Sequence, residues 1–301
     1  MAASVFQGVV PEPRVLRGVP LKDYTTMRVG GPADYLIEPA SEEEIIGVYE
    51  RAKQEGLPVL VLGNGSNLLV SDAGFRGVAL HIGKPFSEIS VHDHKIAAQA
   101  GALLSAVSRA AADHALNGLE FASGIPGSVG GAVYMNAGAY GGEISQVLET
   151  ARVWIDGRIE TWKKNDFHFG YRHSALMDKD ALVLSAEFSL APGDREAILG
   201  LMNDLNSRRR DKQPLQYPSC GSFFKRPEGH FAGALIEQAG LKGFSVGDAQ
   251  VSEKHAGFVI NRGQATASQI YALMKHVQKT VFGQSGVTLE PEVKLIGHFE
   301  S

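Results

Sequence analysis

Three polar residues in separate segments of this 301-residue chain have side chains suited to chemistry. Arg172 lies in FGYRHS, where a fixed guanidinium could bind a carboxylate or phosphate at two points. Ser222 lies in CGSFFKRP and Glu292 lies in LEPEVK. Each also has an ordinary interpretation: an arginine packed on a ring, a serine in a turn and a solvated carboxylate. Since no G-x-S-x-G sequence surrounds Ser222, a hydrolase nucleophile is not indicated.

The segment from Gly124 to Glu143 contains seven glycines among its twenty residues and has no charge before Glu143. Glycine lets main-chain N–H groups approach a ligand closely. Apolar residues such as Ile125, Val129 and Val133 argue against a polar tail. We therefore expect buried backbone, used either for tight turns in a β-rich core or as a cradle for a flat or anionic ligand. Composition alone does not separate these two interpretations.

A second glycine-containing segment, GNGSN at 63–67, follows a short apolar strand predicted over 58–63. Successive N–H groups in such a turn can bind an anion. A Rossmann dinucleotide loop would need a third glycine and a following helix, whereas Leu68 occupies that position and strand-like sequence follows. We therefore reject a Rossmann fold and keep a phosphate-binding turn as a candidate.

Capping patterns predict the elements that position these segments. Ser41 with Glu44 starts a helix over 41–56, and Thr266 with Gln269 starts a helix that ends near Phe282. The pattern also predicts helices over 102–117, 195–210 and 232–240, and several short strands between Arg152 and Leu190.

The sequence VTLEPEVKLIG alternates and predicts a final strand with one apolar face, formed by Val287, Leu289, Val293 and Leu295. At roughly 150 residues per domain, the length favours two domains. The break APGD at 191–194 is the expected boundary between them.

Composition limits the classes of function. The chain is 44% hydrophobic and 21% charged, which is typical of globular proteins. A net charge of −4 argues against binding nucleic acid through a basic surface. The single cysteine, Cys220, allows no internal disulfide and fits a reducing compartment. Since neither a membrane-spanning run nor a signal-peptide pattern is evident, we expect a cytoplasmic protein without membrane or nucleic-acid partners.

Two charged clusters have weaker functional interpretations. His92 and His94 form a pair with no third ligand close in sequence, so no metal site is expected. The basic run at 208–212 is placed at the C-terminal end of a predicted helix, where cations complement the helix dipole. A solvated face is the favoured interpretation of this run, although an anionic substrate could also use it.

Together these segments resemble the UDP-N-acetylenolpyruvoylglucosamine reductases (UDP-N-acetylmuramate dehydrogenases), flavoenzymes that complete UDP-N-acetylmuramic acid synthesis for bacterial peptidoglycan. Seven motifs occur in the family's order nearly end to end: TTMRVGGPADYLIEP, LGNGSNLLV, GIPGSVGGAVYMNAGAYGGE, FGYRHS, CGSFFKRP, VSEKHAGFVIN and LEPEVKLIG. The resemblance implies an α+β fold. Residues 1–193 would form an FAD-binding domain of the vanillyl-alcohol-oxidase/PCMH type, with two α/β subdomains at about 1–85 and 86–193. Residues 194–301 would form a C-terminal α+β substrate-binding domain.

The resemblance also implies the site residues. Arg172, Ser222 as proton donor and Glu292 would be catalytic. The FAD contacts would be Arg28, Gly30, Leu62, Gly63, Asn64, Gly65, Ser66, Asn67, Gly124, Ile125, Pro126, Gly127, Val129, Gly130 and Ala132. The substrate contacts would be Lys212, Arg226, His255 and Asn261. Arg226 replaces an asparagine found in many members. FAD would be bound non-covalently, NADPH would donate the hydride, and no metal is expected.

One type within this family carries an inserted segment, with a tyrosine that closes over the substrate. Here only DKDA separates YRHSALM from the strand LVLSAEF, so the chain resembles the shorter type II. Two alternatives stay open: an FAD-dependent oxidase of the same fold acting on an alcohol, and a non-catalytic UDP-sugar-binding module. The oxidase leaves CGSFFKRP and LEPEV unexplained, and the module would show no flavin absorbance.

Overall fold

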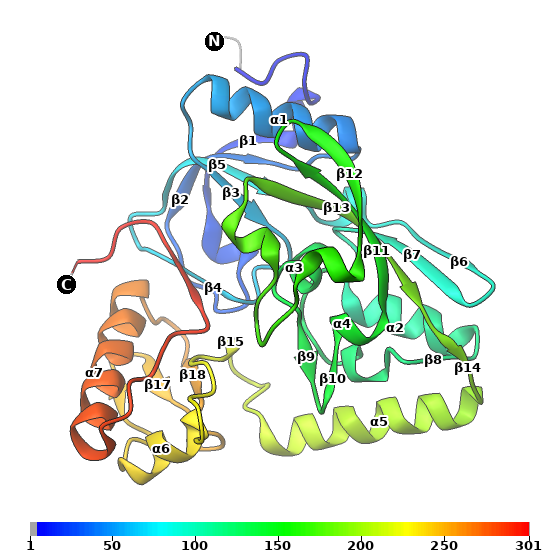
Figure 1. Ribbon diagram of the computed structural model, residues 1–301. Helices are drawn as coiled ribbons and strands as arrows, with labels where there is room; N and C mark the ends of the chain where they lie inside the picture. Colours follow the sequence, from blue (N-terminus) through cyan, green and yellow to red (C-terminus); the bar gives the residue numbers. More distant parts are fainter. Residues whose placement is uncertain (1–4, 301) are drawn as a thin grey trace. The chain divides into compact units, whose positions relative to one another are not determined.

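The computed structural model describes residues 5–300, which form two compact units (Figure 1). Unit 1 comprises the described residues up to Val15, together with Ile37–Asn64 and Ala79–Arg209. Unit 2 comprises Leu16–Leu36, Gly65–Val78 and the described residues from Arg210 onward. Both units are discontinuous in sequence and therefore differ from the predicted ranges 1–193 and 194–301. The functional division into an FAD-binding and a substrate-binding domain stays a prediction.

Unit 1 is built on a five-stranded antiparallel sheet with the order β12-β11-β13-β7-β6. Figure 1 shows these strands in green and cyan. Helices α2 and α3 pack on this sheet, and residues such as Ile96, Val107, Val153 and Phe188 fill the core. The strands are β6 (Ile89–His92), β7 (Lys95–Gln99), β11 (Leu148–Ile155), β12 (Arg158–Lys163) and β13 (Ala181–Ser189). The strands predicted between Arg152 and Leu190 are thereby confirmed.

Three helices of unit 1, α1, α2 and α5, were predicted from capping and periodicity signals, whereas the short helices α3 and α4 were not. Their bounds are α1 (Glu42–Gln54), α2 (Leu104–Asp113), α3 (Val129–Tyr134), α4 (Ile144–Val147) and α5, which runs over Arg195–Lys212. The helix predicted over 102–117 is too long. Ala115 has a left-handed φ of 54° that ends it. Residues Leu116–Asn117 then form β8, which pairs with β14 (Ala191–Pro192).

Helix α1 begins at Ser41, whose hydroxyl accepts a hydrogen bond from the Glu44 N–H at 3.2 Å. The reciprocal half of the predicted capping box is absent. The Glu44 carboxylate instead accepts from the Ala40 N–H at 2.7 Å and forms a two-point ion pair with Arg14. This ion pair fastens the start of α1 to the N-terminal part of unit 1.

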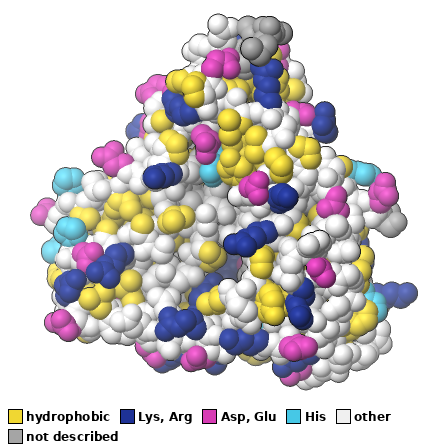
Figure 2. All heavy atoms as spheres, turned by 180° about the vertical axis from the view of Figure 1, so that it is seen from behind, with side chains coloured by type: hydrophobic (Ala, Val, Ile, Leu, Met, Phe, Trp, Pro, Cys, Tyr) yellow, Lys and Arg dark blue, Asp and Glu magenta, His cyan; other side chains and the backbone are white. Residues whose placement is uncertain are grey.

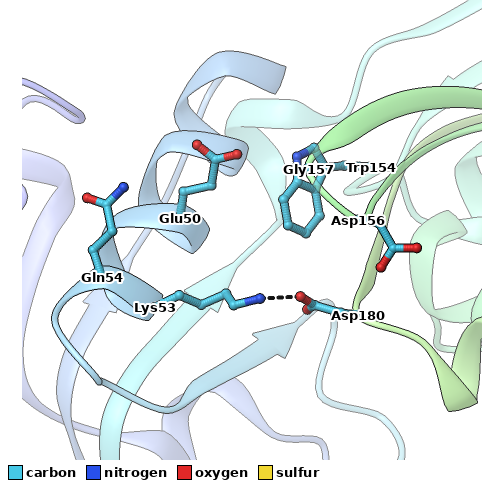
Figure 3. A pocket seen from close by; sticks show the side chains of 7 residues that line it. All are labelled: Glu50, Lys53, Gln54, Trp154, Asp156, Gly157 and Asp180. Carbon is cyan, nitrogen blue, oxygen red and sulfur yellow. Dashed lines mark hydrogen bonds and ion pairs between the residues drawn. The ribbon is translucent and has the colours of Figure 1, made fainter.

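The far end of α1 is fastened to the five-stranded sheet beside a cleft of about 420 Å³ (Figure 3). There Asp180 pairs with Lys53 and accepts a hydrogen bond from Tyr49, whose ring lies edge-on to Trp154. Burial alone would raise the pKa of Asp180, but the hydrogen bonds from Lys53 and Tyr49 outweigh it and lower that pKa. The cleft therefore lies over a contact that holds α1 in place.

Unit 2 contains a second antiparallel sheet with the order β15-β18-β17-β16. Helices α6 and α7 contact one another, and α7 packs on β17 and β16. Figure 1 shows them in yellow and orange. The core between them includes Phe223, Ile236, Ile270, Leu273 and Val277. The elements are β15 (Ser219–Ser222), α6 (Ala232–Gln238), β16 (Ser245–Val246), β17 (Ala249–Val251), β18 (Phe258–Asn261) and α7 (Ala267–Ser285).

An N-terminal segment belongs to unit 2 because it pairs with the end of the chain. β4 (Leu68–Val70) is parallel to β19 (Lys294–Ile296), and Met27, Val29 and Leu69 lie in the unit 2 core. The other short strands are β1 (Val15–Pro20), β2 (Pro32–Ile37), β3 (Val59–Leu62), β5 (Phe75–His81), β9 (Gly138–Ala139) and β10 (Gly142–Glu143). Four of these strands form a sheet with the order β1-β2-β5-β3.

The predicted final strand is largely wrong. Only Lys294–Ile296 are strand, and Leu295 is 38% exposed although it was expected on the apolar face. Leu289 and Val293 are buried as predicted. Pro291 has no N–H to donate, and the Leu289 carbonyl accepts from the Gln278 side chain at 2.8 Å, so the segment packs on α7 without forming a ladder.

The surface carries side chains of both charges, and the described helices are unlike membrane spans. On the face drawn in Figure 2, Lys and Arg side chains are interspersed with Asp and Glu side chains. Within residues 5–300, no helix combines the length and the apolar character needed to cross a membrane.

Candidate active site

The glycine-rich segment combines a short helix with a tight hairpin. After Gly127 the chain enters α3, and the Val129 and Gly130 N–H groups donate to the carbonyls of Ala102 and Ala100 at 2.8 and 2.9 Å. β9 and β10 then form a hairpin that turns at Tyr140 and Gly141, both with positive φ. The tight-turn interpretation is therefore right for this hairpin. The helix was not predicted. The N–H groups of Val129 and Gly130, two expected cofactor contacts, are already used in hydrogen bonds within the protein.

Arg172 lies at the tip of a turn whose ends, Gly170 and His173, hydrogen-bond to each other. Its φ of 53° is left-handed. The guanidinium donates to the Gly138 carbonyl at 3.1 Å and lies 5.2 Å from the centre of the Tyr171 ring. The aromatic packing expected in the ordinary interpretation is present, and the same side chain is tied to the glycine-rich hairpin.

The predicted phosphate turn needs glycine at two positions for steric reasons. A Cβ at Gly63 would overlap the Ser128 hydroxyl, and one at Gly65, where φ is 59°, would overlap the Tyr24 carbonyl. In unit 1 the Asn64 side chain donates to the Pro126 carbonyl at 2.7 Å. The start of the turn is thereby joined to the glycine-rich segment at two of the residues expected to contact FAD.

Arg28, another expected FAD contact, lines a cleft of about 380 Å³ in unit 2 together with Lys22, Asp23 and Thr25. Arg28 is exposed and has a left-handed φ of 56°. Two cations face one carboxylate in this cleft, so its charge suits an anion. Gly30, two residues further along the chain, accepts the Lys22 N–H through its carbonyl at 3.2 Å.

Ser222 and Glu292 lie on neighbouring segments of unit 2. The Glu292 N–H donates to the Phe223 carbonyl at 2.9 Å, the Lys225 N–H donates to the Glu290 carbonyl at 2.8 Å, and Phe224 bridges Pro291. Ser222 is exposed and Glu292 is half-buried. The structure therefore brings two of the three predicted catalytic residues together through their backbones.

Cys220 lies on the same strand as Ser222 but is buried. Burial, with a smaller contribution from the charge of Glu292, raises the pKa of the thiol to about 12. The thiol therefore stays protonated near neutral pH.

Asn67, expected among the FAD contacts, uses its side-chain amide to donate to the Glu292 carbonyl at 3.1 Å. Its own carbonyl accepts the Lys294 N–H at 3.0 Å. The end of the glycine turn is thus hydrogen-bonded to the segment that carries Glu292, within unit 2.

The four expected substrate contacts differ in the exposure and the hydrogen bonding of their side chains. Lys212 is exposed at the end of α5, and Arg226 is exposed with its guanidinium 3.9 Å from the centre of the Phe231 ring. His255 accepts the Gly257 N–H at 3.1 Å, and burial lowers its pKa. Asn261 is 1% exposed and donates to the Met27 carbonyl at 3.2 Å. His255 and Asn261 therefore organise loops, and a substrate contact by any of the four stays a prediction.

Sequence reasoning missed the placement of Arg209. The run at 208–212 was favoured as a solvated face, but Arg209 is half-buried beside Asn206 and Gly124. Burial lowers its pKa. The signal was available in the spacing, because Arg209 lies four residues after the buried Leu205 and so shares its face of the helix.

The residues present suit a flavin dinucleotide with a diphosphate. The Arg28 cleft offers cations for phosphate groups. Gly63 and Gly65 let the backbone of the turn pack closely on Ser128 and Tyr24, and the N–H groups of such a turn can bind an anion.

Comparison with known proteins agrees with this chemistry. Residues 33–161 match the FAD-binding domain family, and residues 213–296 match the C-terminal domain of UDP-N-acetylenolpyruvoylglucosamine reductase. The protein is therefore an FAD-dependent oxidoreductase with a separate C-terminal part. A grass pollen allergen with glucose dehydrogenase activity, Phl p 4, aligns with a TM-score of 0.50 at 14% identity over 64% of this chain and 45% of that chain. This likeness shows the fold alone. With the match to the FAD-binding domain family, the predicted α+β fold with an FAD-binding domain is confirmed.

The chain belongs to the UDP-N-acetylenolpyruvoylglucosamine reductase family. It is 54% identical to the reductase of Agathobacter rectalis over 303 residues, which cover 96% of each chain. It is 50% identical to the reductase of Levilactobacillus brevis over 95% of this chain and 94% of that protein. The crystal structure of the reductase from Thermus caldophilus aligns with a TM-score of 0.81 and 40% identity, over 94% of this chain and 99% of that chain.

Proposed function

We propose that this protein reduces UDP-N-acetylglucosamine enolpyruvate to UDP-N-acetylmuramate, with NADPH as the electron donor and FAD as the bound cofactor. This is a step in the synthesis of peptidoglycan precursors. The observation that carries the proposal is the 54% identity to the Agathobacter rectalis reductase along 96% of the chain. The motifs around Arg172, Ser222 and Glu292 support it, because a shared fold alone would not specify the reaction.

When bound, FAD supplies the redox chemistry by accepting a hydride from NADPH and delivering one to C3 of the enolpyruvyl group. The phosphate turn at 62–67, the Arg28 cleft and the glycine-rich segment are the proposed binding residues. Hydride addition at C3 leaves negative charge at C2, which is delocalised into the adjacent carboxylate. The protein must stabilise this charge and then protonate C2.

Arg172 is proposed to stabilise the charge. Its guanidinium stays protonated and can bind a carboxylate at two points. The hydrogen bond to the Gly138 carbonyl and the contact with Tyr171 limit its orientations. A cation held in a fixed place stabilises developing charge without first reorganising.

Ser222 is proposed to donate the proton to C2. A hydroxyl is a weak acid, but a carbanion-like centre is a strong base, and position can compensate for modest acidity. The exposure of Ser222 on the edge of β15 supports this role, because the hydroxyl is accessible.

Glu292 has a less obvious role, since an ionised carboxylate would oppose negative charge growing on the substrate. We propose that it is protonated during the chemistry or is paired with a cation, so that it orients the substrate without repelling it. Lys212 and Arg226 stay proposed substrate contacts, because both are exposed and basic. The proposal includes a cytoplasmic location, which the single cysteine fits.

The proposal is tested by product analysis. Purified protein with FAD is incubated with NADPH and UDP-N-acetylglucosamine enolpyruvate without oxygen, and the nucleotide sugar is identified by mass spectrometry. We expect a product that has gained two hydrogen atoms, in an amount equal to the NADPH consumed. NADPH consumption without this product would exclude the proposed reaction. Peroxide formed from an alcohol and oxygen would indicate the oxidase, and UDP-sugar binding without flavin absorbance would indicate the binding module.

A further inference from the structure

We propose that Asn136 is a positioning residue that holds Arg172 in place by fastening the turn that carries it. This inference rests on the proposed role of Arg172 in the reaction. All the residues concerned belong to unit 1.

Asn136 is a polar residue in the core of the unit. It is 1% exposed and has a left-handed φ of 48°. Its side-chain nitrogen donates to the Gly170 carbonyl at 3.0 Å, and its side-chain oxygen accepts the Ser145 N–H at 2.9 Å. A buried amide costs free energy unless both of its ends are bonded. Since one partner is an acceptor and the other a donor, an asparagine satisfies both, whereas an aspartate or a leucine of similar size would not.

The Gly170 carbonyl is the part of the turn that Asn136 holds. Gly170 and His173 exchange two hydrogen bonds, of 3.1 and 3.3 Å, around Tyr171 and Arg172. Arg172 is in a left-handed conformation that is unfavourable for a residue other than glycine. A turn with such a residue at its tip needs contacts that hold its ends.

Two further contacts act on the same turn. The buried Ser174 hydroxyl donates to the Tyr134 carbonyl at 2.5 Å. The Arg172 guanidinium donates to the Gly138 carbonyl at 3.1 Å. Residues 134, 136 and 138 therefore bind residues 174, 170 and 172 respectively, so one short stretch of the glycine-rich segment fixes both ends of the turn and the arginine head.

Loss of the Asn136 contact would let the turn move while the side chain of Arg172 stays intact. A displacement of about 1 Å at a charge-stabilising group can cost about 10²-fold in rate. The effect is expected only in the step that uses Arg172. Reduction of the flavin by NADPH does not involve the enolpyruvyl carboxylate and should change little.

The test uses Asn136→Asp, which keeps the size and the acceptor for Ser145 but places a carboxylate oxygen against the Gly170 carbonyl. Stopped-flow spectra of the FAD-loaded protein follow the bleaching of the flavin by NADPH and its recovery with UDP-N-acetylglucosamine enolpyruvate. We expect the recovery to slow by about 10- to 100-fold and the bleaching to stay within about threefold of the wild-type rate. Asn203→Asp, on the exposed face of α5, makes the same chemical change and should affect neither rate.

A double-mutant cycle distinguishes positioning from a general structural effect. If Asn136 acts through Arg172, Asn136→Asp should slow the recovery no further in an Arg172→Ala background. Equal slowing in both backgrounds would overturn the proposal. If Asn136→Asp does not fold, Ser174→Ala is used in its place. It removes the hydrogen bond from Ser174 to the Tyr134 carbonyl, and its effect on the recovery is measured with and without Arg172→Ala.

A measurement that needs no activity follows the turn itself. Trypsin cleaves after Arg172, and the resulting fragments, 1–172 and 173–301, are quantified by mass spectrometry. We expect cleavage at Arg172 in Asn136→Asp to be at least tenfold faster than in the wild type, with cleavage after the exposed Arg158 unchanged. Unchanged cleavage at Arg172 would contradict the inference even if the enzyme proved active. If Asn136→Asp is cleaved faster but the wild-type protein does not reduce the enolpyruvate, the role of Asn136 in holding the turn is supported and only the proposed function is refuted.

Discussion

Ser222 and Glu292 are held by their main chains, so their side chains can be changed without breaking the pairing between their segments. The hydrogen bond from the Glu292 N–H ends on the carbonyl of Phe223, next to Ser222. The Asn67 amide donates to the main-chain carbonyl of Glu292. Mutations of these two side chains should therefore report on chemistry more than on folding.

Ser222→Ala removes the proposed proton donor. We expect it to slow the recovery of the flavin spectrum with enolpyruvate substrate by about 10²-fold or more, because general acid catalysis contributes on that scale. Bleaching by NADPH should be nearly unchanged. Both rates are measured in one anaerobic stopped-flow experiment, with Ser268→Ala on α7 as the control. Equal loss in the two half-reactions would contradict a proton-donor role.

Glu292→Gln and Glu292→Ala separate a neutral carboxyl from a charged one. The glutamine keeps a hydrogen-bond donor of the same shape, so it should retain more activity than the alanine if a protonated carboxyl is required. The comparison uses kcat with saturating NADPH and substrate. If the two variants have the same kcat, a hydrogen bond from a neutral carboxyl is not the function of this residue.

The sequence pointed to candidate catalytic residues because their motifs are local, and their roles stay predictions. The role of Asn136 was not predicted, since it depends on Gly170, which is 34 residues away. Asn67 was expected at the cofactor, and its contact with Glu292 spans 225 residues. Hydrogen bonds between residues so far apart in the sequence leave no pattern in the neighbouring residues from which they could be predicted.

At the scale of elements, the N-terminus of α7 shows how a distant segment completes a helix. The Thr266 hydroxyl accepts the Gln269 N–H at 3.1 Å, and the Gln269 side chain accepts the Thr266 N–H at 3.2 Å, as the capping box predicted. The N–H groups of Ala267 and Ser268 have no acceptor within the helix, and they donate to the Asp72 carboxylate at 2.7 and 2.8 Å. An acid at this end of a helix also complements the helix dipole.

Asp72→Ala should therefore destabilise unit 2. Losing a capping acceptor costs about 1 kcal/mol, with a range of roughly 0.5–2. We expect the apparent Tm to fall by about 2–4 °C in a thermal unfolding experiment. Glu228→Ala, which removes an exposed carboxylate from a loop, serves as the control. A Tm unchanged by Asp72→Ala would mean that solvent replaces this cap without cost.

Elements with a strong local signal were predicted well, and those set by their surroundings were not. Helix α7 has a capping box and a C-terminal glycine, Gly286, with a φ of 71°. The segment after it alternates like a strand, but only its last residues form a ladder, which is parallel to β4. Glu290 and Glu292 instead hydrogen-bond to the segment after β15. Similarly, the helix predicted over 102–117 was extended too far because the turn at Ala115 has no glycine to mark it.

At the scale of the whole molecule, the length indicated two parts but not how the chain is divided between them. Residues 16–36 and 65–78 join the C-terminal residues in unit 2. The parallel pairing of β4 with β19 and the burial of Met27 and Val29 in the unit 2 core explain this. A continuous boundary was the natural expectation, since composition changes at APGD and no local feature indicates that an N-terminal segment packs with the C-terminus.

The whole protein should bind FAD reversibly. Denaturation should release all the yellow colour into the filtrate, and adding FAD to the stripped protein should raise the Tm, because a ligand that binds only the folded state stabilises it by about 2.7 kcal/mol at one hundred times its Kd. Absorbance of the filtrate and a thermal shift titration measure the two effects. Flavin that stays on the denatured chain would rule out non-covalent binding.

The most direct test of the proposed function is the anaerobic flavin spectrum during sequential addition of the two substrates. NADPH should bleach the visible absorbance of the oxidised flavin. UDP-N-acetylglucosamine enolpyruvate should then restore it in a one-to-one ratio. A flavin that NADPH bleaches but this substrate leaves bleached would contradict the account.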